Sequence, residues 1–232
     1  MWVAIKEFLL QVLNYLYSVV NDYGVAIILL TVVVRLALAP LQAKQTKSMY
    51  QMQKVQPKIK ELQKKYKDDK PKLQEETMKF YQENKVNPFG GCLPLILQMP
   101  IFIALFQVLA GKKAPSLPVY LAENDLIAKF LFILPDITKS PQAMFKAAGI
   151  WEALPYITLA VLFGLSVWLP QQLMPGDRQQ KMIGLYMAVM MLYFGWISPA
   201  GVLLYWVTSS IIQIGQQQLS LRAYKRHESQ GA

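Results

Sequence analysis

The feature that most constrains this chain is an apolar run of nineteen residues, Tyr23 to Leu41, that contains a single arginine, Arg35. About 20 apolar residues in a helix match the hydrocarbon core of a membrane, so the run predicts a transmembrane helix. A guanidinium stays charged in a protein, and placing it at mid-membrane costs about 3 kcal/mol or more. We therefore expect Arg35 either to reach the headgroups or to face a water-filled recess.

The composition indicates an integral membrane protein. Hydrophobic residues make up 54% of the 232 residues and charged residues 16%, and the mean hydropathy is +0.26. One cysteine and one histidine exclude an internal disulfide and a Cys/His metal site, and we expect no cofactor. The predicted spans hold no Ser/His, Cys/His or paired-carboxylate set, which argues against an enzyme.

The segment before this run, residues 1–22, is apolar but interrupted by polar residues such as Lys6, Glu7, Gln11 and Asn14. It lacks the ordered basic, apolar and small-residue regions of a signal peptide. We predict an amphipathic helix that lies in the membrane interface. A removable or transmembrane segment is the alternative.

A lysine-rich insert, residues 42–86, follows the first span, residues 23–41. It holds twelve lysines, half of the basic residues of the chain. Positive charge beside a transmembrane end marks the cytoplasmic side, so the first span runs from outside to inside. Apolar residues recur every three or four positions in both halves of the insert, which predicts a cytoplasmic helical hairpin. A solvated charged linker is the alternative.

Further apolar runs predict four more spans, at residues 92–111, 154–173, 182–197 and 201–219. The segment 112–153 has nearly balanced charges, as an external loop should, and the basic tail 220–232 lies inside. The predicted fold class is therefore an all-α integral membrane protein with five transmembrane helices, a cytoplasmic helical hairpin and an N-terminal interfacial helix. Its N-terminus lies outside and its C-terminus in the cytoplasm.

Polar side chains on four of these spans lie at similar depths. They are Thr31 and Arg35 on the first span, Gln98 and Gln171 near two cytoplasmic ends, and Tyr205, Ser209 and Gln213 at steps of four on the fifth. Polar groups on four helices cannot all face lipid cheaply, so we expect them to converge on a hydrated recess around Arg35. No predicted span contains a carboxylate, so this cation should attract acidic or polar residues of another polypeptide crossing the membrane.

Four pieces of the sequence resemble the YidC/Oxa/Alb family of membrane protein insertases: TVVVRLALAPL, VQPKIKELQKKYKDDKPKLQEE, KVNPFGGCLPLILQMPIFIALF and SPAGVLLYWVTSSIIQIGQQQL. The resemblance implies a groove open to cytoplasm and lipid, in which Arg35 receives the polar extracellular part of a substrate. It implies that Gln171 and Trp206 line this groove. The large periplasmic domain that precedes the core in Gram-negative members has no counterpart in this sequence, so we expect either the short, Gram-positive-like type or a trimmed piece of a longer chain.

The implied location is the bacterial plasma (inner) membrane. The implied partners are nascent membrane proteins, the Sec translocon with targeting factors or the ribosome, and membrane lipids, with no specific nucleic-acid site. No GxxxxGK[ST] motif occurs, so we expect no direct nucleotide hydrolysis. The rival function is a channel or transporter for a small solute. It needs a polar path open to both sides, and the outer halves of the spans lack polar residues.

Overall fold

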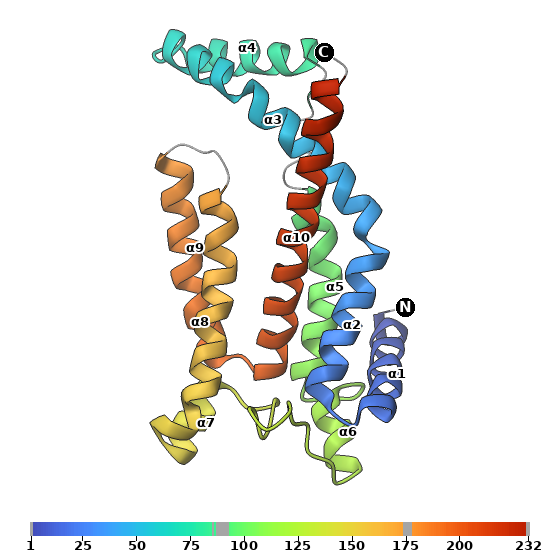
Figure 1. Ribbon diagram of the computed structural model, residues 1–232. Coiled ribbons are helices and arrows are strands. Elements are labelled where there is room, and N and C mark those ends of the chain that lie inside the picture. Colours follow the sequence, from blue (N-terminus) through green and yellow to red (C-terminus); the bar gives the residue numbers. More distant parts are fainter. Residues whose placement is uncertain (1, 85, 87–92, 174–177, 231–232) are drawn as a thin grey trace. The chain divides into compact units, whose positions relative to one another are not determined.

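The computed structural model describes residues 2–84, 86, 93–173 and 178–230. Within these residues the regular structure is helical, and the only β-type pairing is an isolated bridge between Phe130 and Leu134. Figure 1 shows the helices along the chain. The predicted all-α class is confirmed.

The chain divides into two compact units. The larger unit comprises residues 1–37 and 100–214, and the smaller unit comprises residues 38–99 and 215–232. Two helices contribute residues to both units. They are α5 (Leu93–Ala110) and α10 (Ala200–Gln230).

The larger unit contains most of the helices. Besides its parts of α5 and α10, it has α1 (Trp2–Val20), α2 (Tyr23–Ala37), α6 (Leu117–Glu123), α7 (Pro141–Ala148), α8 (Ile150–Leu173) and α9 (Arg178–Ile197). One hydrophobic cluster connects α1, α2, α5, α8 and α10, and its most buried side chains include Leu13, Ile27, Leu105, Phe163 and Leu203.

Helix α1 packs beside α2 with Leu9 and Leu13 buried, while Phe8 and Tyr15 on its other side are exposed. The indole Nε1 of Trp2 donates a 3.0 Å hydrogen bond to Oε1 of Gln107 on α5. The structure therefore has a helix over the predicted segment. Its placement in the membrane interface stays a prediction.

Helices α8 and α9 lie side by side (Figure 1). A glycine permits the close approach, because a Cβ added to Gly164 of α8 would lie 2.6 Å from Cγ of Leu192 on α9. Such small residues let membrane helices pack tightly. Helix α8 begins at Ile150, four residues before the predicted Leu154, and continues through Pro155.

The segment expected to be an external loop, residues 112–153, contains two short helices, α6 and α7. Both have a proline in the first turn, where the missing N–H costs nothing. Ser140 caps α7 by accepting a 3.1 Å hydrogen bond from the backbone N–H of Ala143. The local turn chemistry therefore builds helices that hydropathy alone does not predict.

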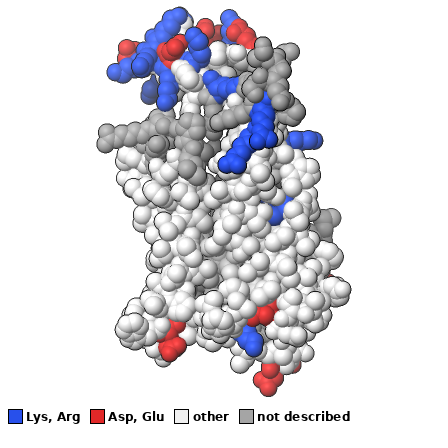
Figure 2. Space-filling view, viewed as in Figure 1, with Lys and Arg blue, Asp and Glu red and all other residues white. Residues whose placement is uncertain are grey.

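The smaller unit contains α3 (Ala39–Lys65) and α4 (Lys70–Glu83), which pack against each other. Asp69 caps α4 by accepting a 3.1 Å hydrogen bond from the N–H of Lys72. The Tyr224 hydroxyl of α10 donates a 3.0 Å bond to the carbonyl of Ala43. Figure 2 shows that lysine and arginine side chains gather on α3 and α4, whereas the visible face of the larger unit is mostly uncharged.

Two described helices are long and apolar enough to cross a membrane, Trp2–Val20 and Ile150–Pro170. A third is counted if Tyr23–Ala37 and Ala39–Met52 form one broken span. The break follows from Pro40, which has no N–H to donate to the turn before it. Met99–Ala110 and Gly184–Ile197 are shorter apolar helices. The count of five spans stays a prediction.

Candidate functional site

Arg35 lies in the last turn of α2, and only 6% of it is exposed. Its Nε donates a 2.8 Å hydrogen bond to Oγ of Ser209, and its Nη2 donates a 3.0 Å bond to Oε1 of Gln213. Both acceptors belong to α10. The guanidinium is thus directed into the larger unit, where a neutral hydroxyl and a neutral amide accept hydrogen bonds from it.

The acceptors belong to a polar face of α10 that recurs every fourth residue: Tyr205, Ser209 and Gln213. Residues four apart lie one above the other on a helix, so this spacing directs the three side chains the same way. Tyr205 is 3% exposed and lies close enough to Arg35 to interact with it electrostatically. The structure therefore brings together Arg35 and three of the residues predicted from sequence.

The remaining predicted residues are placed differently. Thr31 lies one turn before Arg35 and is buried, but its hydroxyl donates a 2.6 Å bond within α2, to the carbonyl of Ile27. Trp206 points away from the polar face of α10 and packs against aromatic rings. The side chains of Gln98 and Gln171 lie outside the described part of the chain.

Sequence reasoning missed an aromatic cluster beside this site. It consists of Phe102 and Phe106 of α5, Phe163 of α8, Phe194 of α9 and Trp206 of α10. The rings form a closed circuit of contacts, because Trp206 meets Phe102 at 4.9 Å and Phe163 at 5.5 Å between centroids, and Phe194 meets Phe106 at 6.0 Å and Phe163 at 6.5 Å. Phe102 and Phe106 close it at 6.0 Å.

The aromatic cluster lies at nearly the same level along α10 as the residues that hold Arg35. Trp206 precedes Ser209 by three residues on α10, which is about 4.5 Å along the helix axis. Aromatic pairs in such tilted and edge-on arrangements add about 0.5–1.5 kcal/mol each beyond their burial. The cluster therefore joins four helices immediately on the Ala200 side of the arginine. The spacing of Phe102 and Phe106 was the one local signal that could have pointed to it.

The described residues contain no group of three or more His, Cys, Asp or Glu side chains that could hold a metal ion. What the site offers chemically is a fixed cation with hydroxyl and amide neighbours. Such a group binds carboxylates and other anions through charge-assisted hydrogen bonds.

Comparison with known proteins gives a consistent result. The family described as the 60Kd inner membrane protein matches residues 15–228. The curated proteins "Membrane protein insertase YidC" of Francisella tularensis subsp. novicida (strain U112) and subsp. tularensis (strain WY96-3418) are 37% identical over 222 residues. The match covers 95% of this chain and 36% of theirs, so the chain spans little more than a third of their length.

A solved structure described as an active YidC insertase with its first transmembrane domain resolved is also similar. It is 30% identical with a TM-score of 0.69, and the match covers 93% of this chain and 46% of that one. The resemblance predicted from the four sequence pieces is confirmed, and this chain belongs to the 60Kd inner membrane protein family.

Proposed function

We propose that this protein inserts newly made membrane proteins into the bacterial inner membrane. The observation that carries the proposal is the guanidinium of Arg35, buried in an apolar helical unit and held by the neutral acceptors Ser209 and Gln213. The names of the curated relatives support an insertase. The substrates are the polar ends of nascent membrane proteins that must cross the bilayer.

The proposed chemical step is an exchange of hydrogen bonds at Arg35. A carboxylate on the substrate offers charge-assisted bonds, which are about twice as strong as those between neutral groups. An acidic residue can therefore take the place of Ser209 or Gln213 on the guanidinium. Water in the groove then hydrates the released hydroxyl and amide, and the polar segment stays solvated inside the membrane.

In this proposal the groove is lined by polar side chains from several spans, among them Thr31, Gln98, Gln171 and Tyr205, and Trp206 borders its closed end. The groove opens to the cytoplasm and to lipid. While the polar end is held there, the substrate's apolar helix moves into the bilayer beside the spans. Burial of its apolar surface, worth about 25 cal/mol per Å², supplies the driving force without nucleotide hydrolysis.

The aromatic cluster supports an insertase over the rival channel or transporter. A channel needs a hydrated path that reaches both faces of the membrane, and the five packed rings lie on the Ala200 side of the arginine. A groove closed on that side lets polar segments enter from one face only. We infer that this face is cytoplasmic, because the lysine-rich residues 42–86 and the basic tail follow the positive-inside rule.

The proposed topology has five spans, with the N-terminus outside and the C-terminus in the cytoplasm. The amphipathic α1 lies in the outer interface. In the cytoplasm, α3 and α4 form a lysine-rich hairpin that meets nascent chains and the Sec translocon, targeting factors or ribosome. The ammonium groups of Lys65 and Lys72 lie 5.2 and 5.6 Å from the centroid of the Tyr66 ring. These cation–π contacts place positive charge at the tip of the hairpin.

The test uses the full chain in proteoliposomes with a single-span substrate whose translocated tail carries Asp and Glu. R35E should abolish insertion and R35A should reduce it strongly, whereas R35K should retain part of it because an ammonium still attracts carboxylates. K113E, on an exposed lysine, is the matched control for charge reversal. Wild-type insertion by a folded R35E variant would refute the proposal, and rapid solute flux through the wild type would favour the channel.

A further inference from the structure

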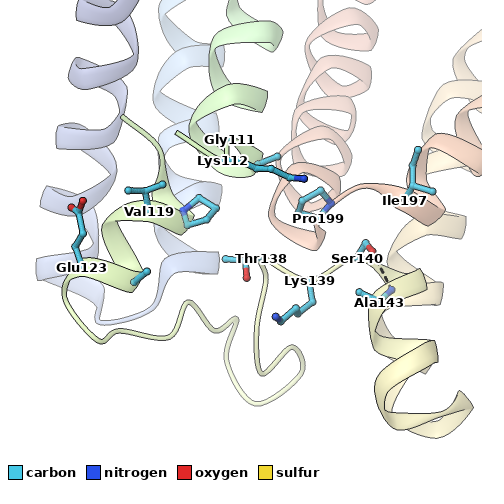
Figure 3. Close-up of a pocket in the computed structure, with 13 residues that line it drawn as sticks. Gly111, Lys112, Val119, Glu123, Thr138, Lys139, Ser140, Ala143, Ile197 and Pro199 are labelled. Atoms are coloured by element: carbon cyan, nitrogen blue, oxygen red, sulfur yellow. Dashed lines mark hydrogen bonds between the residues drawn. The ribbon is translucent and has the colours of Figure 1, made fainter. Parts of the chain in front are cut away.

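A cavity of about 650 Å³ lies at the end of the larger unit where α5 and α9 terminate. Its walls come from the last residues of α5 and α9, from α6, and from the segment Thr138–Ser140 that leads into α7. Figure 3 shows these residues around the cavity. None of the predicted groove residues whose side chains the structure describes lines it.

The cavity sits where the hydrocarbon region of the membrane should end. Helix α5 is mostly apolar and carries no charged residue up to Ala110, and the next residues, Gly111 and Lys112, line the cavity. Helix α9 ends at Ile197, which lines the cavity together with Pro199. Apolar helices end at the headgroup level, so the cavity is at headgroup depth.

Exposed apolar side chains in the same part of the unit also indicate contact with lipid. Phe132 is 95% exposed, Trp151 is 81% exposed and Ile127 is 71% exposed. Large side chains rarely remain in water at such exposure, and aromatic rings are enriched at membrane interfaces. We therefore expect these side chains to contact lipid headgroups and the upper part of the acyl chains.

Two lysines bring positive charge to the cavity. Figure 3 shows Lys112 on the side where α5 ends and Lys139 on the loop opposite it. Within the described residues no carboxylate lies within 4.0 Å of the Lys112 Nζ, whereas the Nζ of Lys139 lies 4.0 Å from Oδ2 of Asp136. With Glu123 as the third charged lining residue, the lining carries a net charge of +2 − 1 = +1.

Backbone hydrogen bonds hold this cavity in shape. The N–H of Ala200 donates a 2.9 Å bond to the carbonyl of Lys139, and the N–H of Gly201 donates a 2.8 Å bond to the carbonyl of Ile137. The Tyr156 hydroxyl donates a 2.9 Å bond to the carbonyl of Asp136. Because the loop is fixed to α8 and α10, a ligand meets a site that is already formed, which lowers the entropic cost of binding.

We propose that this cavity binds the phosphodiester headgroup of a membrane phospholipid. The Lys112 and Lys139 ammonium groups pair with the phosphate, and the hydroxyl of Ser140 can donate a hydrogen bond to it. Seven of the thirteen lining residues are Ala, Pro, Val or Ile, including Val119 and Ile197, and contact the glycerol and first acyl carbons. The single net positive charge matches a phosphodiester, which carries one negative charge, better than dianionic inorganic phosphate.

This site is separate from the insertion groove and its existence does not depend on insertase activity. A bound headgroup fastens the ends of α5, α9 and α10 to one leaflet, which is the outer leaflet in the proposed topology. It thereby keeps the helices that carry the aromatic cluster at a fixed depth.

The test reconstitutes the full chain in phosphatidylcholine vesicles that contain phosphatidylglycerol with a photoreactive headgroup. Adducts are mapped by peptide mass spectrometry, and lipid retained in detergent is counted by native mass spectrometry. We expect adducts in residues 110–123 and 138–143. K112Q should lower labelling and retention about tenfold, the loss of one charge-assisted hydrogen bond, and K112Q/K139Q should lower them further.

K113Q is the matched control, since Lys113 is the exposed neighbour of Lys112 and does not line the cavity. It should label as the wild type does. All these lysines are exposed, so we expect their substitution to leave folding intact, and unchanged Tm values would verify this. Equal labelling of K112Q and K113Q would overturn the proposal.

Two further outcomes would assign the cavity to another ligand. Loss of adducts on adding inorganic phosphate would identify a site for free phosphate. Adducts from an acidic substrate tail but not from lipid would identify a site through which the substrate leaves the groove.

Discussion

The Nε of Arg35 and the Oγ of Ser209 lie 2.8 Å apart and join α2 to α10 across 174 positions of sequence. One turn further along α10, Gln213 accepts the second bond of the guanidinium. Both acceptors are neutral, so the positive charge is positioned by groups that a carboxylate can replace. The proposed insertion step depends on this property, and it can be tested without removing the arginine.

The substitution Gln213→Glu places a carboxylate where the amide oxygen now accepts from Arg35 Nη2 at 3.0 Å. The shape is unchanged, but the new carboxylate forms a permanent ion pair that competes with acidic substrate residues. We expect insertion of acidic-tailed substrates to fall at least tenfold while Tm stays the same or rises. Gln218→Glu, at an exposed position of α10, should insert normally. Wild-type insertion by Q213E would contradict the exchange at Arg35.

The substitution Trp206→Ala removes the ring that touches both Phe102 and Phe163. Loss of a packed tryptophan costs about 3–5 kcal/mol in protein cores, so Tm should fall clearly. Because the aromatic cluster closes the groove in our proposal, W206A vesicles should also leak a small dye or ion faster. Trp206→Phe keeps an aromatic ring and should restore both properties in large part. A destabilised but tight W206A would show that the cluster has a packing role only.

The shared face of the polar residues on α10 was within reach of sequence reasoning, because spacing along one helix is local. Residues four apart on a helix share a face, so the spacing of Ser209 and Gln213 predicts a common direction. A buried arginine needs polar neighbours, which made α10 the natural partner for Arg35. The start of α4 is local in the same way, because Asp69 caps the helix and a proline lies in its first turn.

The aromatic cluster and the cavity were not within reach, because both depend on how distant helices pack. The sequence places Phe163 and Phe194 on separate apolar runs, and nothing local specifies that their rings meet at 6.5 Å. A hydropathy profile also ignores whether each residue can form the backbone hydrogen bonds of a helix. The run from Tyr23 to Leu41 is continuous by hydropathy, yet α2 ends at Ala37 because Pro40 cannot donate a backbone bond.

The substitution Gly164→Ala tests the packing of α8 on α9. The added Cβ would lie 2.6 Å from Cγ of Leu192, closer than carbon atoms pack, so the helices or the leucine must move. Overpacking of this kind costs about 1–3 kcal/mol. In a Leu192→Ala background the same change should cost little, which a double-mutant cycle on Tm or unfolding free energy would reveal. Gly215→Ala is the control, because nothing lies within 4 Å of its added Cβ.

The substitution Asp22→Ala tests how the loop around Phe130 is attached to the start of α2. Asp22 is 7% exposed, and its carboxylate accepts hydrogen bonds from the N–H of Val25 at 2.9 Å and of Leu131 at 2.6 Å. Alanine leaves both donors without their acceptor, at a cost of about 1–3 kcal/mol. The N–H of Gly24, which donates to the carbonyl of Lys129 at 3.1 Å, should then exchange with deuterium faster. Asp22→Asn keeps one oxygen acceptor, so it should protect Val25 or Leu131 but not both. Unchanged exchange at Gly24 and Leu131 in D22A would mean that side-chain packing, with Phe130 against Gly24, holds the loop by itself.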